Sequence, residues 1–157
     1  MTRMRLLCTV LLACLLLTSC SQSESSVQHA AGWEATGEIE LSGILGETGE
    51  EFTTTWVGLE EKIAISNNPF YAGEQQKYMW LLWGEKEELV HKDFTVTATS
   101  EEGEEMTLVE SRLGGENWGA TASFPSSIAL PSAGLWKLDA YVDGSLFSTI
   151  VVPVTEK

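Results

Sequence analysis

Cysteine is scarce in this sequence, and most of the chain has none. The three cysteines are Cys8, Cys14 and Cys20, so nothing after position 20 can form a disulfide or supply a thiolate to a metal or a substrate. Histidine is almost as rare, with only His29 and His91. Two histidines without thiols cannot make the usual zinc site, and no Gly-x-Ser-x-Gly motif supplies a hydrolase nucleophile. The composition therefore gives no positive indication of catalysis.

Basic residues are few as well. Nine Lys and Arg stand against 23 Asp and Glu, and the formal net charge is −14. Such an acidic surface repels the phosphates of nucleic acids and anionic lipid headgroups, so we expect no nucleic-acid partner. The acidity suits attraction to cations or to a basic partner, and it equally suits an ordinary soluble domain outside the cytoplasm.

Long hydrophobic runs are limited to the first twenty residues. Arg3 and Arg5 precede an apolar stretch, 6–17, that is too short to span a membrane and has the length of a signal peptide. It ends in Leu17-Thr18-Ser19-Cys20, which matches a lipobox, the sequence at which bacteria attach a diacylglyceryl group to cysteine and cleave before it. We therefore predict that residues 1–19 are a lipoprotein signal peptide and that Cys20 is lipidated. The alternative is an ordinary secretory signal with a chance cysteine at its end.

A lipidated Cys20 predicts an extracytoplasmic protein that is held on the cell membrane by acyl chains such as palmitate. Residues 20–32 are small and polar without periodicity, as in a flexible tether. From Trp33 the pattern changes to short alternating runs that are separated by turn residues. We predict one domain over residues 33–157 after the tether.

The folded part is predicted to be all β. Helical periodicity is limited to residues 85–90, whereas short strand-like runs follow one another along the rest of the domain. These runs are 33–41, 52–57, 62–66, 77–83, 94–99, 106–110, 119–124, 135–142 and 145–154. The pattern predicts an immunoglobulin-like antiparallel β-sandwich of about seven to nine strands.

Two of these runs carry more detail. Asp143-Gly144 separates the last two runs and predicts a hairpin, because a type I′ turn needs positive φ at both central residues. Residues 77–83 (KYMWLLW) are apolar at almost every position, which indicates a strand covered on both faces or one that lines a partner surface. Trp80 and Trp136 are the predicted core anchors. Trp83, three residues after Trp80, should face the opposite side of its strand.

The closing segment is similar to the last hairpin of immunoglobulin-like domains. Ser132-Ala133-Gly134-Leu135-Trp136-Lys137-Leu138 precedes Asp143-Gly144, and Trp136 stands where many such domains have a corner tyrosine. Leu138 stands where some of those domains have a disulfide cysteine, which agrees with the missing disulfide.

A longer set of motifs extends from about Val57 to Val154. Its members are Asn68-Pro69-Phe70, Gln76-Lys77-Tyr78-Met79-Trp80, Trp83-Gly84, Leu113-Gly114-Gly115-Glu116-Asn117-Trp118-Gly119-Ala120, Pro125-Ser126-Ser127 and Leu130-Pro131-Ser132-Ala133-Gly134-Leu135-Trp136-Lys137-Leu138-Asp139-Ala140-Tyr141. Together they resemble a family of lipoproteins from Gram-positive bacilli whose domain has no known function. The resemblance implies the fold and the location, and it implies no activity.

Tryptophan is more frequent than a sandwich core of this size requires, with six residues. Trp118 stands in Gly114-Gly115-Glu116-Asn117-Trp118-Gly119, a loop whose glycines let a partner approach the backbone closely. We predict a partner-binding surface that consists of this loop, with Trp83 and Tyr71 as its neighbours. The alternative is that Trp118 folds back as a lid over the core.

Four glutamates surround a predicted hairpin turn at Gly103. Glu101, Glu102, Glu104 and Glu105 supply the carboxylate oxygens that calcium prefers, although their spacing matches no EF-hand. A cation site there is a hypothesis, and a solvated turn is its alternative.

These patterns favour a lipid-anchored binding module on the extracytoplasmic face of the bacterial cell membrane, with an envelope protein as its partner. No catalysis and no cofactor are assigned. Two other classes stay open, a sensor domain that binds a cation or a glycan and an envelope enzyme that uses carboxylates. A structural spacer would show neither activity.

Overall fold

The computed structural model describes residues 32–44, 46 and 48–157. The predicted signal peptide, the lipidation site Cys20 and almost all of the predicted tether lie outside these residues. Within the described part of the chain, no helix is both long and apolar enough to cross a membrane.

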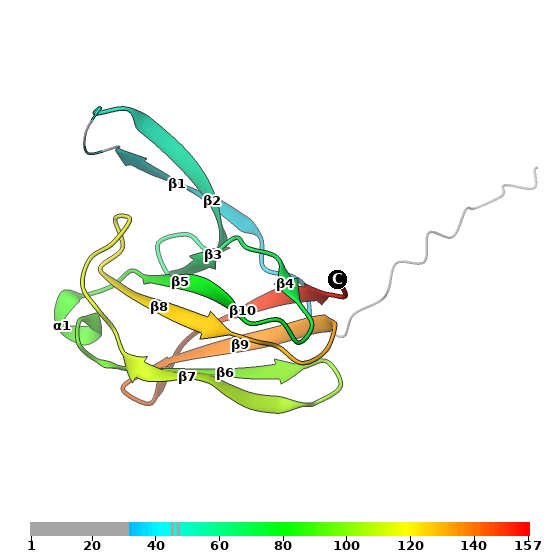
Figure 1. Cartoon of the computed structure of the whole chain (residues 1–157). Helices are drawn as coiled ribbons and strands as arrows, with labels where there is room; N and C mark the ends of the chain where they lie inside the picture. Colours follow the sequence, from blue (N-terminus) through cyan, green and yellow to red (C-terminus); the bar gives the residue numbers. More distant parts are fainter. Residues whose placement is uncertain (1–31, 45, 47) are drawn as a thin grey trace, which may run out of the picture.

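The described residues form ten strands and one short helix, and the strands make two five-stranded sheets that pack face to face (Figure 1). The first sheet contains, in spatial order, β1 (Glu38–Ile44), β2 (Glu51–Leu59), β3 (Ile63–Ser66), β5 (Gln76–Leu82) and β8 (Ala122–Ile128). The second sheet contains β4 (Phe70–Tyr71), β10 (Ser145–Thr155), β9 (Gly134–Val142), β6 (Asp93–Ser100) and β7 (Glu105–Arg112). The helix α1 (Lys86–Leu89) lies between β5 and β6. The predicted all-β sandwich is confirmed.

One strand is absent from the predicted runs, and β8 runs through Pro125 to Ile128, beyond the predicted end at residue 124. β4 is only two residues long, and it pairs in parallel with β10, where Phe70 lies opposite Val154 and Tyr71 opposite Thr155. A strand this short has no alternation of its own, and its pairing depends on residues that are distant in the sequence. The sandwich is therefore antiparallel except at this edge, and it has one strand more than the runs indicate.

The main core lies between the two sheets and contains both predicted anchors. Trp80 and Trp136 are fully buried, and the Trp80 ring meets Phe94 edge-on with 5.8 Å between the ring centroids. The indole N–H of Trp80 donates to the hydroxyl oxygen of Ser126 at 3.0 Å, and that of Trp136 donates to the carbonyl oxygen of Ser132 at 3.0 Å. A buried donor without a partner costs about 1–3 kcal/mol, so these two bonds let the core hold both indoles.

The hairpin predicted at Asp143-Gly144 is confirmed. Both residues have positive φ, 46° and 77°, as a type I′ turn requires. The alternation of β9 puts every second side chain into the core. The ladder between β9 and β10 has one irregularity, a bulge between Leu146 and Ser148.

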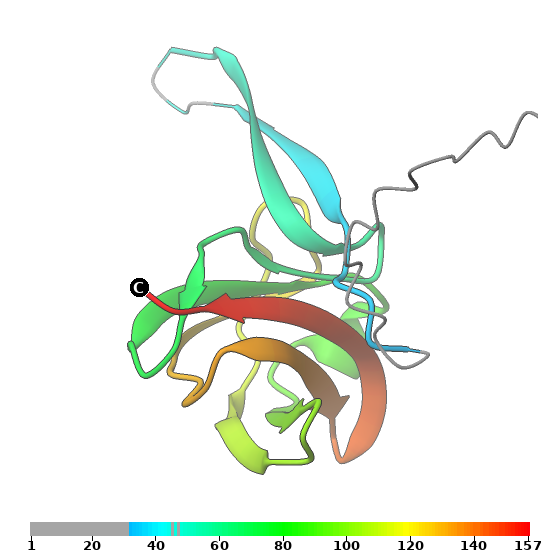
Figure 2. The same cartoon turned by 90° about the vertical axis from the view of Figure 1, so that its right-hand side faces the viewer.

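β1 and β2 form a hairpin that projects beyond the two packed sheets (Figures 1 and 2). The chain before it is bound to the second sheet. The N–H of Thr36 donates to the Val151 carbonyl at 2.8 Å, and the N–H of Val151 donates to the Thr36 hydroxyl at 2.8 Å. Because these bonds hold Thr36 along β10, the first strand begins at Glu38 rather than at Trp33.

Candidate functional site

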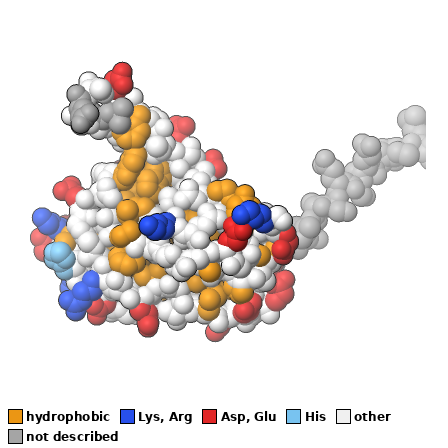
Figure 3. Space-filling model, viewed as in Figure 1, with side chains coloured by type: hydrophobic (Ala, Val, Ile, Leu, Met, Phe, Trp, Pro, Cys, Tyr) orange, Lys and Arg blue, Asp and Glu red, His pale blue; other side chains and the backbone are white. Residues whose placement is uncertain are grey.

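The first sheet is apolar on its outer face as well as on its core face. We call the outer group the outer-face cluster. Its buried members are Trp56, Ala64, Leu81 and Ala120, and its partly exposed members are Ile39, Leu41, Met79, Trp83 and Trp118. On the surface, hydrophobic side chains form a band that runs from the projecting hairpin onto the body of the domain (Figure 3).

This double cover explains the apolar segment 77–83. Successive side chains of β5 point to opposite faces of the sheet, so one set enters the main core and the other joins the outer-face cluster. The core side chains are Tyr78, Trp80 and Leu82, and the outer side chains are Met79, Leu81 and Trp83. The interpretation of a strand covered on both faces is therefore confirmed, as is the opposite orientation of Trp80 and Trp83.

Trp118 lies over the aromatic part of the outer-face cluster. Its ring centroid is 5.2 Å from that of Phe52 and 5.5 Å from that of Trp56, and both pairs meet edge-on. Aromatic pairs of this geometry contribute about 0.5–1.5 kcal/mol beyond the area that they bury. Trp118 is thus folded back as in the lid alternative, but over the outer face of the sheet, and part of its side chain stays accessible to solvent.

The backbone at Trp118 has an uncommon conformation. Trp118 and Gly119 have positive φ, 50° and 74°, and they form a two-residue turn closed by hydrogen bonds of 3.2 and 2.8 Å between Asn117 and Ala120. A bulky residue in this region costs about 1–2 kcal/mol. The contacts of the indole with Phe52 offset that cost. Strain of this kind persists only where surrounding contacts hold it, and it is frequent at functional sites.

Three hydrogen bonds attach the loop to the end of β5, and in one of them the N–H of Gly84 donates to the hydroxyl of Thr121 at 3.3 Å. The indole N–H of Trp83 donates to the Gly119 carbonyl at 3.0 Å. The hydroxyl of Thr121 donates to the Gly84 carbonyl at 2.8 Å. The loop is therefore held in one position relative to the sheet before any partner arrives.

Two grooves adjoin this hydrogen bond between Trp83 and Gly119. Trp83 lines a groove of about 490 Å³, which we call the acidic groove, and Gly119 lines one of about 500 Å³, which we call the loop groove. The acidic groove places Glu38, Glu40, Glu60 and Glu61 around Ile39, Leu41 and Trp83. The loop groove carries Lys86, His91 and Glu116 together with Gly84, Gly115 and Gly119. The outer face thus combines a partly exposed aromatic centre with two hollows of different charge.

Comparison with known proteins assigns the chain to a family. The model of a domain of unknown function, DUF4871, matches residues 26–152. The chain belongs to this family. A crystal structure of a candidate lipoprotein from Bacillus anthracis is similar, with 24% sequence identity and a TM-score of 0.52 over 78% of this chain and 86% of that one. At this identity the likeness establishes a shared fold. No curated protein matches the chain.

In this DUF4871 domain, most of the residues predicted to bind a partner lie together. Trp83 and Trp118 belong to the outer-face cluster, and Gly115 and Glu116 line the loop groove. The other two are Asn117, whose side-chain amide is 3.8 Å from the sulfur of Met79, and Gly114, whose N–H donates to the Ser123 carbonyl at 2.8 Å. Whether they contact a partner stays a prediction.

Tyr71 does not belong to this group, which corrects the prediction. It lies on β4 in the second sheet, where the ammonium of Lys157 is 5.9 Å from its ring centroid. Figure 1 shows β4 and the loop that precedes β8 on opposite sides of the domain. In place of Tyr71, Phe52 and Trp56 complete the aromatic surface. Phe52 and Trp56 are four residues apart in the predicted strand 52–57, so both were expected on the same face of it. Nothing in the sequence indicated that this face contacts Trp118.

The acidic turn does not assemble a cation site either. Among the described residues, no group of three or more Asp, Glu, His or Cys side chains is placed to hold a metal ion. The turn is closed by its own backbone, since Ser100 accepts the N–H of Gly103 on its carbonyl and that of Glu104 on its hydroxyl, each at 3.0 Å. This closure needs no ion, and it supports the solvated-turn alternative. The hypothesis concerned Glu101, Glu102, Glu104 and Glu105, of which the last three are exposed.

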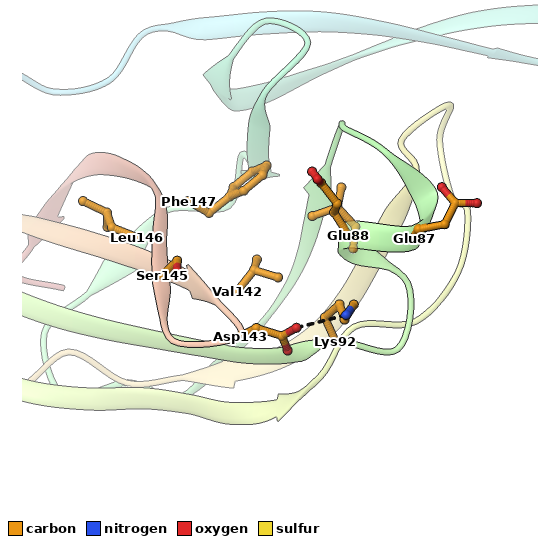
Figure 4. Close-up of a pocket in the computed structure, with 9 residues that line it drawn as sticks. Glu87, Glu88, Lys92, Val142, Asp143, Ser145, Leu146 and Phe147 are labelled. Carbon is orange, nitrogen blue, oxygen red and sulfur yellow. Dashed lines mark ion pairs between the residues drawn. The ribbon is translucent and has the colours of Figure 1, made fainter.

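A third hollow, of about 380 Å³, lies beside the turn between β9 and β10 (Figure 4). The ammonium of Lys92 is 3.1 Å from a carboxylate oxygen of Asp143, and the other oxygen of Asp143 accepts the N–H of Asp93 at 3.1 Å. The hydrogen bond from Lys92, with a smaller effect from the Asp93 amide, holds the pKa of Asp143 below its ordinary value. These contacts join Asp143 in the turn to Asp93, the first residue of β6, and to Lys92 just before it, so we assign the three residues a structural role.

Proposed function

We propose that this protein is a lipid-anchored binding module of the bacterial envelope, and that the outer-face cluster and its two grooves form its binding surface. The observation that carries the proposal is the partly exposed pair Trp83 and Trp118 at the centre of an apolar sheet face. Contiguous exposed apolar patches mark interaction sites, and aromatic residues are enriched in interfaces between proteins. The surface therefore suits a protein partner.

The build of this surface supports the same proposal. The hydrogen bond from Trp83 to Gly119 and the edge-on contacts of Trp118 fix the aromatic side chains in place. A surface that is ordered before binding loses less conformational entropy on association, so more of its contact energy appears as affinity.

The location in the envelope is supported by the leader and by the family. Leu17-Thr18-Ser19-Cys20 matches a lipobox, and a structure that shares the fold is described as a candidate lipoprotein of a bacillus. We place the domain on the extracytoplasmic face of the cell membrane, held by acyl chains on Cys20. An immunoglobulin-like relationship of the sandwich belongs to the same proposal, and the bond from the Trp136 indole to the Ser132 backbone supports it.

The proposal assigns no catalysis and no cofactor. The sensor alternative predicts that calcium or an envelope glycan raises the melting temperature of the protein, because a ligand that binds only the folded state stabilises it. A melting screen against both tests that alternative separately from partner binding.

The test of the proposal is cross-linking on intact cells that carry tagged full-length protein, followed by mass spectrometry. We expect one recurrent envelope protein, which is lost with Trp118→Ala. Tyr141→Ala is the matched control, since it removes a partly buried aromatic ring from β9 in the other sheet. Equal capture by wild type and Trp118→Ala, or no specific capture at all, would contradict the proposal.

A further inference from the structure

The open edge of β1 carries backbone groups that point away from β2. The N–H of Gly58 donates to the carbonyl of Gly37 at 3.1 Å, which makes these two residues a hydrogen-bonded pair in register with the ladder between β1 and β2. Hydrogen-bonded and non-hydrogen-bonded pairs alternate along an antiparallel ladder. Odd-numbered residues of β1 therefore bond to β2, and the backbone groups of even-numbered residues, among them Glu40 and Ser42, face the open edge. Within the described residues, β1 pairs with no other strand.

The acidic groove includes residues 38–41 of β1, and this part of β1 has two chemically different faces. Ile39 and Leu41 lie on the face of the sheet that carries Trp83, whereas Glu38 and Glu40 lie on the opposite face. Two further glutamates come from the turn between β2 and β3. A strand added at the open edge of β1 would lie beside apolar side chains of β1 on one face and beside the carboxylates of Glu38 and Glu40 on the other.

The charge of this region is one-sided. Residues 33–61 contain eight glutamates and no Lys, Arg or His. Among the four glutamates of the acidic groove, Glu38 accepts a hydrogen bond from the side-chain amide of Asn67 at 2.9 Å. In the part of the chain that the structure describes, the ion pairs lie elsewhere, and none involves these four carboxylates. The groove therefore attracts a cationic partner.

We propose that the edge of β1 binds an extended segment of a partner protein in which basic side chains alternate with apolar ones. This inference rests on the proposed function and names the chemistry of its partner. The segment extends the first sheet through backbone hydrogen bonds to residues such as Glu40 and Ser42, a recognised mode of peptide binding. Its apolar side chains lie over Ile39 and Leu41, and its Lys or Arg side chains meet the glutamates, because successive residues of a strand point to opposite faces.

A second copy of this chain fits the same edge poorly. Each chain has a net charge of −14, and pairing β1 with itself would bring the Glu38 and Glu40 side chains of two chains onto adjacent strands. Like charges on paired strands are destabilising. Charged side chains on an edge strand are also a common means of preventing self-association.

The test uses a labelled, capped peptide with the seven-residue length of β1 that alternates lysine with valine. Full-length protein in a nonionic detergent is titrated into it, and fluorescence anisotropy gives the dissociation constant. We expect saturable binding that weakens at least about tenfold when the ionic strength rises from about 0.05 M to about 0.5 M. A peptide that alternates glutamate with valine is the control, and it should not bind.

Two pairs of variants separate backbone pairing from charge. Ser42→Pro removes an outward N–H without changing the charge, and proline is tolerated on an edge strand, so affinity should fall about tenfold while Ser42→Ala keeps it. Glu40→Lys reverses one charge in the groove and should weaken binding similarly. Glu105→Lys makes the same change on exposed β7 and should leave the affinity within about twofold. Thermal melting of each variant verifies that it is folded.

Absence of saturable binding would overturn the inference. Equal affinity of Ser42→Pro and Ser42→Ala would also overturn it, because charge attraction alone would then explain the binding. Self-association that Ser42→Pro abolishes would identify a second copy as the occupant instead. If the peptide fails to bind while cross-linking that depends on Trp118 persists, this inference fails and the proposed function stands. If the cross-linking fails as well, both fail.

Discussion

The indole N–H of Trp83 donates to the carbonyl oxygen of Gly119 at 3.0 Å, and this bond connects the end of β5 with a loop that is 36 residues further along the chain. Trp83 lines the acidic groove and Gly119 lines the loop groove. This hydrogen bond therefore connects a wall of one hollow with a wall of the other, and its removal should affect both.

Trp83→Phe tests this bond because it keeps an aromatic ring and removes the donor. The carbonyl of Gly119 is close to solvent and can bond to water, so we expect a loss of only about 1 kcal/mol in the free energy of unfolding. Urea denaturation of wild type and variant measures it. The amount of captured partner should fall clearly even though the protein stays folded, because the loop loses its fixed position. A variant with normal capture would show that the bond has only a structural role.

Trp118→Ala should destabilise the protein without unfolding it. The substitution removes the contacts with Phe52 and Trp56 on the outer face and leaves the core between the sheets intact. We expect a loss of about 2 kcal/mol, because the side chain is only partly buried and the variant also relieves backbone strain. Trp80→Ala is the comparison, with an expected loss of about 3–5 kcal/mol from the main core. Equal losses in denaturant titrations would mean that Trp118 acts as a core residue.

Gly43→Ala tests the packing at the far end of the hairpin. A Cβ at Gly43 would lie 2.8 Å from the ring of Phe52 and 3.3 Å from that of Trp118, so the aromatic cluster must shift, at a cost of about 1–3 kcal/mol. Gly37→Ala is the control, since nothing lies within 4 Å of its Cβ. Combining Gly43→Ala with Phe52→Ala should cost less than the sum of the two single changes. Additive losses in this double-mutant cycle would exclude the contact.

Asp143→Asn should reduce the dependence of stability on acid pH. The pKa of Asp143 is held below its ordinary value of 3.8, chiefly by the hydrogen bond with Lys92. A carboxyl with a lowered pKa in the folded state contributes stability above its unfolded pKa, and this contribution disappears as the pH falls through the folded pKa. Wild type should therefore lose its advantage over the variant below about pH 4. Asn also suits a type I′ turn, so the backbone stays unchanged. Melting temperatures from pH 2 to 7 provide the measurement, and parallel curves would contradict the prediction.

Tyr78 should titrate late and limit stability at alkaline pH. Its ring stacks on Phe70 with 4.2 Å between centroids, its hydroxyl donates to the Pro69 carbonyl at 3.1 Å, and burial raises its pKa to about 12. The unfolded chain releases this proton near pH 10, so stability is full below that pH and falls as the pH rises toward 12. Absorbance titration should show a late tyrosine transition that is absent in Tyr78→Phe. The same absorbance titration in wild type and Tyr78→Phe near pH 12 would contradict the burial of Tyr78.

Local patterns were sufficient for much of the fold. The Asp143-Gly144 turn, the alternation of β9 and the double apolar character of 77–83 each depend on neighbouring residues, and each predicted its element. The core positions of Trp80 and Trp136 followed from the same patterns.

The candidate site depends on contacts between distant segments. The alternation of apolar and polar residues predicts strands, but it does not predict which distant segments meet. Trp118 is a lid only because Phe52 and Trp56 lie under it, and Tyr71 leaves the site only because β4 pairs with β10. The sequence of each segment contains no motif that indicates which distant segment it will contact. The loop and Trp83 could be grouped from composition, whereas the hairpin that completes the surface required the three-dimensional arrangement.

Under the proposed anchoring at Cys20, the bonds between Thr36 and Val151 have a mechanical consequence. A pull from the membrane side reaches Thr36 before it reaches β1, and the two 2.8 Å bonds transfer the load to β10, a strand paired along most of its length with β9. The β1–β2 hairpin lies beyond this clamp and remains unloaded. Force on the anchor is thus expected to strain the second sheet first, while the edge of β1 keeps its shape.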